Sequence, residues 1–324
     1  PGGCVLGERS VAAHIDAFSK VGVTVKYEDE MVKFVAPKVH EKKYRIWQME
    51  ASVTATENLA MYASGIKSEV EVVDAAGEPH VVDLLNLLKT MGAEIEGTGT
   101  NKLVIKGKHN LEGGKYKSRP DFVDIAGYII AAAVTDGEIR IVGGNVPEIV
   151  DGMCLWFRAF NISIVSDGDD LVVKRGGELR LDLTMGNVPM AGKNLPKLVP
   201  RPWPGFPVDV IPVMVTLASK CTGKLLIQNW MYESGLDFVR EMNGMGADIF
   251  ALDPHRIIVN GPVKFRGGEV FSPSVIQACK AIFLASLCDK TETVIHGVEI
   301  LKRRYPDIME TYRGLGAKIE VLEG

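Results

Sequence analysis

A short pattern of apolar and small residues recurs along the chain. Four copies and one weaker copy occupy residues 20–25, 90–95, 244–249, 314–319 and 159–164. The glycine or asparagine of each copy, at positions 22, 92, 161, 246 and 316, follows the previous one by 70, 69, 85 and 70 residues. Glycine and asparagine accept the left-handed conformation that ends many helices. At each copy the pattern predicts a helix that ends there and a strand that follows.

The segments before these copies predict helices that have no solvent face. Residues 128–134 read Tyr-Ile-Ile-Ala-Ala-Ala-Val, which is apolar all round a helix. Similar helices are expected at residues 58–64, 213–219 and 281–288. The expected strands alternate between apolar and polar residues, as at 69–72 and 93–96, so each sheet turns one face to water. We therefore predict repeated βαβαββ units in which sheets surround buried helices.

The number of units predicts two lobes. Three units follow Asp121, whereas one complete unit and the tail of another precede it. We expect an α/β (α+β) chain with an incomplete first lobe at residues 1–119 and a second lobe of three units at residues 120–324. The longest spacing contains residues 193–207, which include five prolines. This stretch predicts either a rigid extended connection or a long surface loop.

The composition is that of an ordinary globular protein. The chain has 324 residues, of which 46% are hydrophobic and 24% charged, which excludes a disordered or collagen-like protein. A formal net charge of −4 supplies no global positive field for nucleic acid or an anionic membrane. Neither a membrane span of about 20 apolar residues nor a signal peptide is evident. We expect a monomer that binds neither nucleic acid nor membrane.

Five cysteines are an odd number, and none forms a Cys-x-x-Cys pair: they are Cys4, Cys154, Cys221, Cys279 and Cys288. This argues against a disulfide framework and a zinc ribbon, and it favours a reducing cytoplasm. All except Cys4 lie in apolar contexts typical of a core. Because the chain begins at Pro1 in a Gly-Gly turn, we interpret it as a fragment or a processed product.

The N-terminal residues 1–9, Pro-Gly-Gly-Cys-Val-Leu-Gly-Glu-Arg, resemble the catalytic loop of the UDP-N-acetylglucosamine enolpyruvyl transferases, which belong to the enolpyruvate transferases. Further matches, in family order, are residues 51–58, 77–80, 120–121, 202–209, 230–234 and 303–305. The resemblance implies an inside-out α/β barrel with two lobes of three βαβαββ units, the first incomplete here. It also implies transfer of enolpyruvyl from phosphoenolpyruvate to the 3′-hydroxyl of UDP-N-acetylglucosamine, with release of phosphate. This step opens peptidoglycan synthesis and requires no cofactor or metal.

Such a reaction requires a proton donor, a base and cations for phosphate and carboxylate. The resemblance implies that Cys4 is the proton donor, adds to phosphoenolpyruvate and is alkylated by fosfomycin. It implies that Asp209 is the general base, that Arg9 binds the phosphate and that Arg303 lies near the carboxylate. From the residues alone, the alternatives are a turn residue for Cys4, a helix N-cap for Asp209, and a solvated charge for Arg9 and for Arg303.

The same resemblance assigns the UDP moiety to a loop formed by Ser52, Val53 and Thr54, and it places Met231 at the substrate. Thr54 and Glu57 are spaced as a capping box, and the free amides of a helix N-terminus suit a diphosphate. A plain helix cap is the alternative interpretation of this loop. His14, Glu78 and His80 lie in motif positions but receive no role.

The chain also departs from the family pattern. Gln277 and Gly235 stand where the family carries arginine, and Phe122 where it carries arginine or histidine. The family's early lysine, asparagine and a further arginine belong to sequence that precedes Pro1. Each lost charge-assisted hydrogen bond costs about 1.5–3 kcal/mol. Two alternatives therefore stay open: a non-catalytic paralogue that binds a UDP-sugar, and a transferase for another hydroxyl acceptor, such as a nucleoside or shikimate 3-phosphate.

Overall fold

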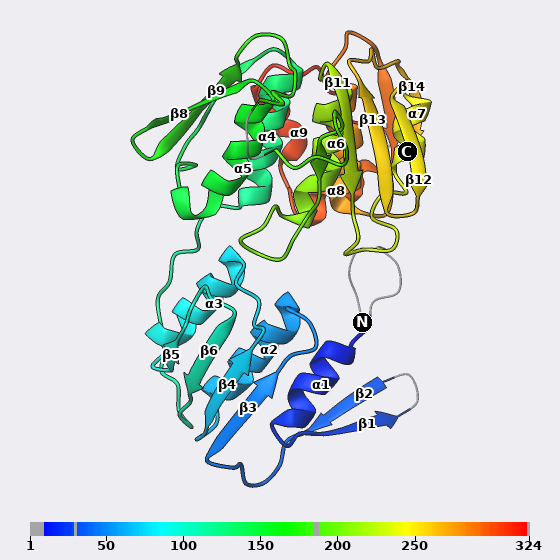
Figure 1. Ribbon diagram of the computed structural model, residues 1–324. Helices are drawn as coiled ribbons and strands as arrows, with labels where there is room; N and C mark the ends of the chain where they lie inside the picture. The colour runs from blue at the N-terminus through cyan, green and yellow to red at the C-terminus, as the bar shows by residue number, and fades with distance from the viewer. Residues whose placement is uncertain (1–9, 29–30, 185–187, 323–324) are drawn as a thin grey trace. The chain divides into compact units, whose positions relative to one another are not determined.

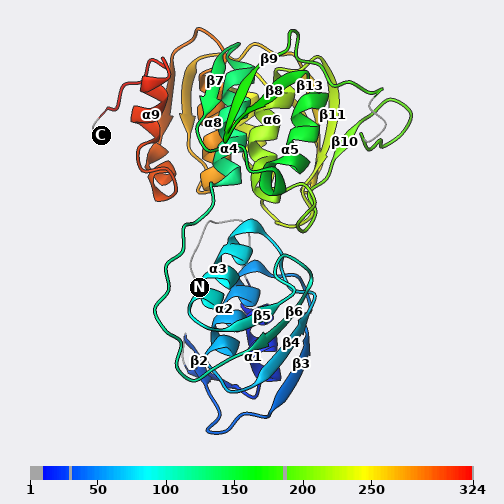
Figure 2. The same cartoon turned by 90° about the vertical axis from the view of Figure 1, so that its left-hand side faces the viewer.

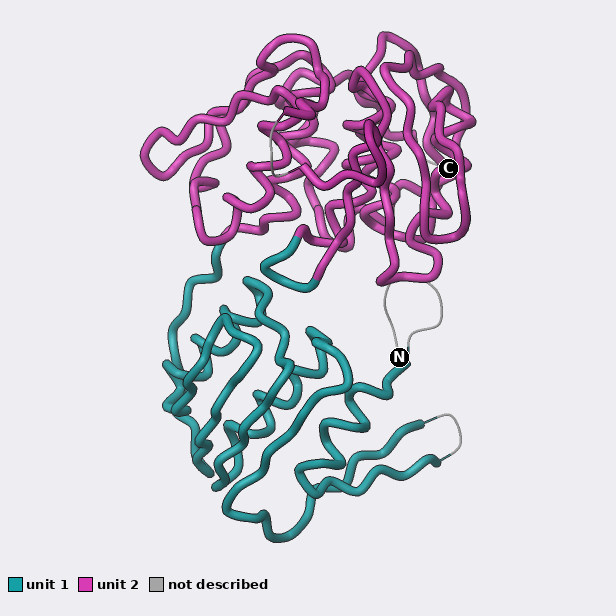
Figure 3. Tube along the Cα trace, in the orientation of Figure 1, with its two compact units in different colours: residues 1, 9–119, 202–205 teal, residues 2–8, 120–201, 206–324 magenta. Residues whose placement is uncertain are grey.

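The chain divides into two compact units. The computed structural model describes residues 10–28, 31–184 and 188–322. Of the described residues, unit 1 comprises those from Ser10 to Arg119 together with Pro202–Gly205, and unit 2 comprises Pro120–Arg201 and those from Phe206 onward (Figure 3). Each unit buries its own hydrophobic cluster. The proline-rich connection is thus shared, because its Pro202–Gly205 segment packs with unit 1.

Unit 1 contains one complete βαβαββ element set and part of another. A helix and a hairpin come first: α1 (Ala12–Lys20), β1 (Thr24–Glu28) and β2 (Met31–Val35). The complete set follows: β3 (Lys43–Trp47), α2 (Val53–Ser64), β4 (Glu69–Val73), α3 (Pro79–Thr90), β5 (Glu94–Glu96) and β6 (Lys102–Lys106). Its strands lie in the order β3-β4-β6-β5, with β3 and β4 parallel and the other pairs antiparallel. Helix α2 is the crossover that two parallel neighbouring strands require.

Unit 2 repeats this arrangement three times, to different extents. The first set is α4 (Phe122–Val134), β7 (Glu138–Ile141), α5 (Pro147–Ala159), β8 (Ile162–Asp167) and β9 (Asp170–Arg175). The second is β10 (Lys197–Leu198), η1 (Val208–Val210), α6 (Ile211–Ser219), β11 (Gly223–Gln228), α7 (Val239–Gly244), β12 (Asp248–Asp253) and β13 (Arg256–Gly261). The third is β14 (Gly268–Phe271), α8 (Ile276–Ser286), β15 (Thr293–His296), η2 (Val298–Arg303) and α9 (Ile308–Gly314).

The strand orders confirm that the repeat is βαβαββ. The order β10-β11-β13-β12 is that of β3-β4-β6-β5, with the first pair again parallel. The order β7-β9-β8 supplies the last three strands of the pattern, and β14 and β15 supply the first, parallel pair. The sequence prediction of a strand after Gly316 is wrong for the described residues, because residues 317–322 have no strand partner among them.

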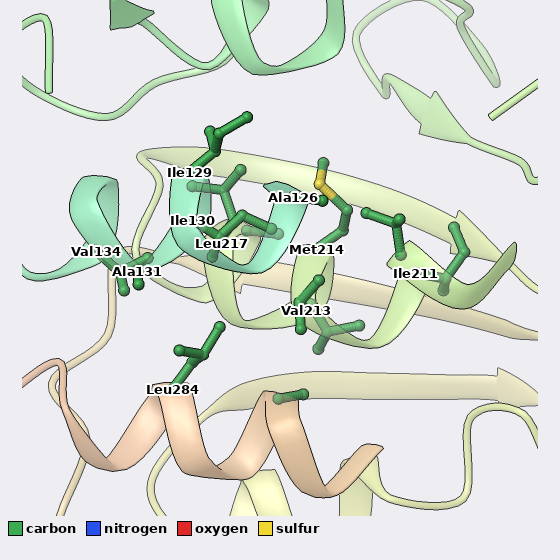
Figure 4. Packing of buried hydrophobic residues seen from close by; sticks show 14 of the residues in the cluster. Ala126, Ile129, Ile130, Ala131, Val134, Ile211, Val213, Met214, Leu217 and Leu284 are labelled. Carbon is green, nitrogen blue, oxygen red and sulfur yellow. The ribbon is translucent and has the colours of Figure 1, made fainter. Parts of the chain in front are cut away.

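Three helices form the centre of unit 2, with sheets around them (Figures 1 and 2). Every residue of α6 is buried, as are nine of α8 and eleven of α4. Figure 4 shows Ile129 and Ile130 of α4 beside Leu217 of α6, with Leu284 of α8 nearby. Strands such as β4 alternate between buried and half-buried residues. The predicted inside-out arrangement is therefore confirmed.

The left-handed positions that define the repeat are present at all five copies. Gly22, Gly92, Asn161, Gly246 and Gly316 have φ values of 82°, 102°, 64°, 95° and 101°. At Gly92 the amide donates to the carbonyl of Lys89, and the amide of Ala93 donates to the carbonyl of Leu88. This is the hydrogen-bond pair of a Schellman motif, and it satisfies carbonyls that the helix end leaves unpaired.

The proline-rich connection is not only loop, because it contributes β10, which pairs with β11. No helix among the described residues is both long and apolar enough to cross a membrane.

The backbone requirement at Gly316 is testable. A Cβ there would meet no atom within 4 Å, so substitution Gly316→Ala acts only through the left-handed φ of 101°. We expect it to lower the free energy of unfolding by about 1 kcal/mol. Gly314→Ala, in α9 and equally open, should instead stabilise the protein by up to about 1 kcal/mol. Urea denaturation followed by circular dichroism measures both. Equal effects would contradict the assignment.

Candidate functional site

The predicted site residues fall into three groups. Cys4 and Arg9 lie outside the described residues. Ser52, Val53 and Thr54 belong to unit 1, and Asp209, Met231 and Arg303 belong to unit 2. The described candidates in unit 1 and those in unit 2 thus belong to separate compact units.

Ser52 is the N-cap of α2, which corrects the predicted capping box. Its backbone is extended, and its hydroxyl accepts a hydrogen bond from the amide of Ala55 at 3.4 Å. Thr54 is instead exposed in the first turn, and Asn58 Nδ2 donates to its carbonyl at 2.9 Å. The capping box failed because serine at 52 competes with threonine at 54 for the cap, and three residues after Ser52 stands Ala55 rather than an acid.

A buried hydroxyl at Thr56 connects this helix end to neighbouring segments. Thr56 Oγ1 donates to the Ser52 carbonyl at 2.7 Å and accepts from Gln48 Nε2 at 2.9 Å and the Ala76 amide at 3.0 Å. Gln48 Nε2 also donates to the carbonyl of Asp74. Both Thr56 and Gln48 are buried. The sequence did not single out Thr56, although it lies inside the matched motif at residues 51–58.

Two acidic side chains of unit 1, Glu57 in α2 and Glu78 at the start of α3, lie close enough to interact. Burial raises the pKa of Glu57, while nearby His80 lowers it and nearby Glu78 raises it further. Glu78 occupies the N-cap position of α3, but its side chain does not cap the helix. Glu78 Oε2 and Gln48 Oε1 are buried and have no hydrogen-bond partner among the described residues. This part of unit 1 thus holds acceptor atoms that the described protein leaves unsatisfied.

In unit 2, Asp209 lies in η1, directly before α6. Its Oδ2 is 3.8 Å from Arg304 Nη1. The same guanidinium makes a bidentate pair with Asp121: Nη2 lies 2.9 Å from Oδ1, and Nε lies 3.0 Å from Oδ2. Asp121 is in turn the N-cap of α4, where Oδ1 accepts from the amides of Val123 and Asp124. Two carboxylates from different repeats therefore share one arginine.

The arginine that reaches Asp209 is Arg304, not Arg303. Arg303 is exposed and forms no ion pair with any residue that the structure describes. In the sequence, residues 303–305 match a family motif, but Arg304 received no role of its own. No sequence signal could have separated the two, because the partner Asp121 lies 183 residues away along the chain. The role expected for Arg303 stays a prediction.

A buried lysine supports this end of unit 2. Lys280 of α8 is 1% exposed, and its Nζ lies 2.7 Å from Asp124 Oδ1 and 3.9 Å from the ring centre of Tyr305. Burial lowers the pKa of Lys280, and Asp124 opposes this shift. A Cβ at Gly127 would collide with Lys280 Nζ, so the glycine leaves space for the ammonium group. The detectable signal was a single lysine in an otherwise apolar helix.

The three departures from the family pattern have local structural partners. Gln277 Nε2 donates to the Tyr305 hydroxyl at 3.0 Å. A Cβ at Gly235 would collide with Asn229 Nδ2, so this backbone requires glycine as long as Asn229 stays in place. Phe122 is buried at the start of α4. Each position is thus occupied by a residue that fits its own surroundings.

Met231 is half-buried in the segment that joins β11 to α7. Its neighbour Trp230 is half-exposed, and the indole Nε1 donates to the carbonyl of Pro200 at 2.9 Å. No group of three metal-ligating side chains occurs among the described residues. The described arrangement can therefore offer carboxylates, a shared guanidinium and helix N-termini to a ligand.

Comparisons with known proteins agree on one family. The family described as EPSP synthase (3-phosphoshikimate 1-carboxyvinyltransferase) matches residues 1–312. UDP-N-acetylglucosamine 1-carboxyvinyltransferase of Treponema denticola is 35% identical over 323 residues, which is 100% of this chain and 73% of that protein. The protein of the same name from Bradyrhizobium diazoefficiens is 36% identical over 320 residues, or 99% of this chain and 72% of that one.

Solved structures show the same fold. The enolpyruvyl transferase NikO from Streptomyces tendae has a TM-score of 0.82 at 20% identity and covers 96% of this chain and 72% of its own. EPSP synthase from Acinetobacter baumannii has a TM-score of 0.70 at 17% identity, with 99% and 74% covered. The fold class expected from the sequence is confirmed.

The buried Thr56 hydroxyl should contribute more to the free energy of unfolding than a surface hydroxyl would. Thr56→Val leaves the Ala76 amide unpaired and removes one acceptor of Gln48, so we expect unfolding free energy to fall by about 2–3 kcal/mol. Thr56→Ser keeps the hydroxyl and should cost about 1 kcal/mol. Urea denaturation of both variants measures the difference. A larger loss in Thr56→Ser than in Thr56→Val would show that methyl packing, rather than the hydroxyl, matters.

Removing one partner of the buried Lys280–Asp124 pair should destabilise the protein more than removing both partners. Asp124→Asn leaves the lysine buried without a counter-charge, so we expect a loss of about 3 kcal/mol in unfolding free energy. Adding Lys280→Met to that variant should restore most of the lost unfolding free energy. Stability of the Asp124→Asn protein should also fall as pH decreases through the lowered folded pKa of Lys280, because the unfolded lysine holds its proton more tightly. No rescue by the second substitution would contradict this account.

Proposed function

The chain belongs to the EPSP synthase family of 1-carboxyvinyltransferases, and we propose that it transfers the enolpyruvyl group of phosphoenolpyruvate to the 3′-hydroxyl of UDP-N-acetylglucosamine. Phosphate is the second product, and the reaction is the first committed step of peptidoglycan synthesis. The observation that carries this proposal is 35–36% identity, over essentially the whole chain, to proteins that bear the name of this activity. The likeness to NikO and EPSP synthase supports the fold alone.

The chemistry assigns a task to each proposed residue. In the addition step the acceptor hydroxyl loses a proton and carbon 3 of phosphoenolpyruvate gains one. The adduct then loses phosphate from carbon 2 and a proton from carbon 3, which restores the double bond, so a base and an acid are both required. Asp209 is the proposed base, and its place before α6, beside Arg304, supports an ionised carboxylate. Cys4 is the proposed proton donor and the target of fosfomycin. Arg9 and Arg303 are the proposed cations for the phosphate and carboxylate of phosphoenolpyruvate.

The nucleotide is assigned to unit 1. Ser52, Val53 and Thr54 begin α2, where the helix N-terminus offers amides and a partial positive charge to a diphosphate. The hydrogen bonds at Thr56 fix the Ser52 carbonyl and thereby the path of this loop. Met231 in unit 2 is the remaining proposed substrate contact. No cofactor or metal has a part in the proposed reaction.

The proposed setting is the cytoplasm of a cell that builds peptidoglycan, so the activity serves cell shape and cell division. The described cysteines Cys154, Cys221, Cys279 and Cys288 are free thiols, which supports a reducing compartment. Burial raises the pKa of the first three to about 11, 12 and 11, respectively, as expected of core thiols rather than nucleophiles. We propose a monomer, because each unit buries its own core.

Phosphate release with phosphoenolpyruvate and UDP-N-acetylglucosamine tests the proposal. We expect turnover, with the product identified by mass spectrometry. Asp209→Asn should lower kcat about 100-fold or more, since it removes the base. Asp151→Asn, an exposed aspartate of α5, is the matched control and should leave kcat unchanged.

Three other results would each redirect the assignment. Turnover only with a different hydroxyl acceptor would indicate a transferase of other specificity. A rise in melting temperature with UDP-N-acetylglucosamine, without turnover, would indicate a non-catalytic binding protein. Full activity of Asp209→Asn would remove Asp209 from the base role, and a Cys4→Ala, Cys4→Asp and Cys4→Ser series examines the proton donor in the same assay.

A further inference from the structure

Arg304 lies between two carboxylates that come from different repeats of unit 2. Asp121 makes the shorter contacts with Arg304. Nη2 of Arg304 lies 2.8 Å from Oδ2 of Asp121, in addition to the bidentate bonds already described. Asp209 faces Nη1 at 3.8 Å, which is longer than a hydrogen bond. The planar guanidinium fork has a fixed geometry, so binding Asp121 through Nε and Nη2 also sets the direction of Nη1.

The surroundings hold this arginine in one orientation. Asp121 is fixed by the first amides of α4. The next residue, Tyr305, is buried, and its hydroxyl bonds to Gln277 while its ring lies against the Lys280 ammonium. Burial opposes the charge on Arg304, but Asp121 and Asp209 outweigh that effect and keep its pKa above the ordinary value. Arg304 is therefore a charged group that Asp121 anchors, although a third of its side chain is exposed.

We propose that Arg304 is a positioning residue that orients the Asp209 carboxylate for the transfer reaction. This inference rests on the proposed function and on Asp209 as its base. A base must face the acceptor hydroxyl in one geometry and stay ionised. Arg304 Nη1 lies 3.8 Å from the Asp209 carboxylate, close enough to attract its negative charge but too far to form a hydrogen bond with it. Asp121 maintains this distance by holding the guanidinium.

The charges around Arg304 argue against a direct role in binding substrate. Its two carboxylate neighbours carry two negative charges against its single positive charge, so the trio as a whole is anionic. A phosphate or carboxylate ligand would be repelled by Asp121 and Asp209. Arg304 should therefore affect the rate of the chemical step, whereas an anion-binding arginine would affect the KM for phosphoenolpyruvate.

Steady-state kinetics of Arg304→Met and Arg304→Lys separate these roles. We expect Arg304→Met to lower kcat about tenfold or more, with the KM for phosphoenolpyruvate changed less than about twofold. Arg304→Lys keeps the charge but loses the fork, so its kcat should lie between those of wild type and Arg304→Met. Added methylguanidinium should partly restore the kcat of Arg304→Met. Arg256→Met, which breaks an exposed pair with Asp253, is the control and should retain wild-type kinetics.

A second variant, Asp121→Asn, tests the same proposal even if Arg304→Met fails to fold. Asp121→Asn can still cap α4 but releases the guanidinium from its bidentate bonds, so kcat should again fall without a matching rise in KM. A raised KM for phosphoenolpyruvate with kcat intact would overturn the assignment in favour of anion binding. Wild-type kcat in both variants would also overturn it. An inactive wild-type protein would instead refute the proposed function and this inference with it.

Discussion

The burial of three helices on all sides is the constraint on which unit 2 depends. Helix α6 has no exposed residue, and α4 and α8 are nearly as buried, because sheets cover them. Helices that are buried on all sides place most of their polar groups at their ends, although Lys280 lies inside α8. Asp121 caps α4, Asp209 lies in the turn before α6, and Gln277 is in the first turn of α8. Each repeat of unit 2 therefore places a polar residue at or next to the N-terminus of its buried helix.

Much of the fold was predictable because its signals are local. The positive φ at Gly22, Gly92, Gly246 and Gly316 is a property of one residue, and the buried helices are visible as apolar runs. The strand after Gly316 was not predictable in the same way, because a strand depends on a partner. The helix cap also failed locally, since Ser52 and Thr54 are both good caps and only the three-dimensional structure selects Ser52.

The site was predictable only where a motif carried it. Asp209 was proposed from its neighbours in the sequence, whereas the position of Arg304 depends on Asp121, 183 residues earlier. Lys280 likewise depends on Asp124 and on the space left by Gly127, two features of a different helix. Such pairs follow from how repeats pack against one another, and neither composition nor spacing encodes that packing. The Thr56 network in unit 1 was missed for the same reason.

Charge balance limits what this end of unit 2 can do alone. Asp121, Asp124 and Asp209 carry three negative charges, whereas Arg304 and Lys280 supply two positive ones that are already paired. Gln277 adds no charge, and its amide is committed to Tyr305. Such a cluster suits proton abstraction but does not attract a doubly anionic substrate. Under the proposed function, binding of phosphoenolpyruvate would therefore fall to arginines outside the cluster. Arg303, which is exposed and has no ion pair among the described residues, is the proposed candidate in unit 2.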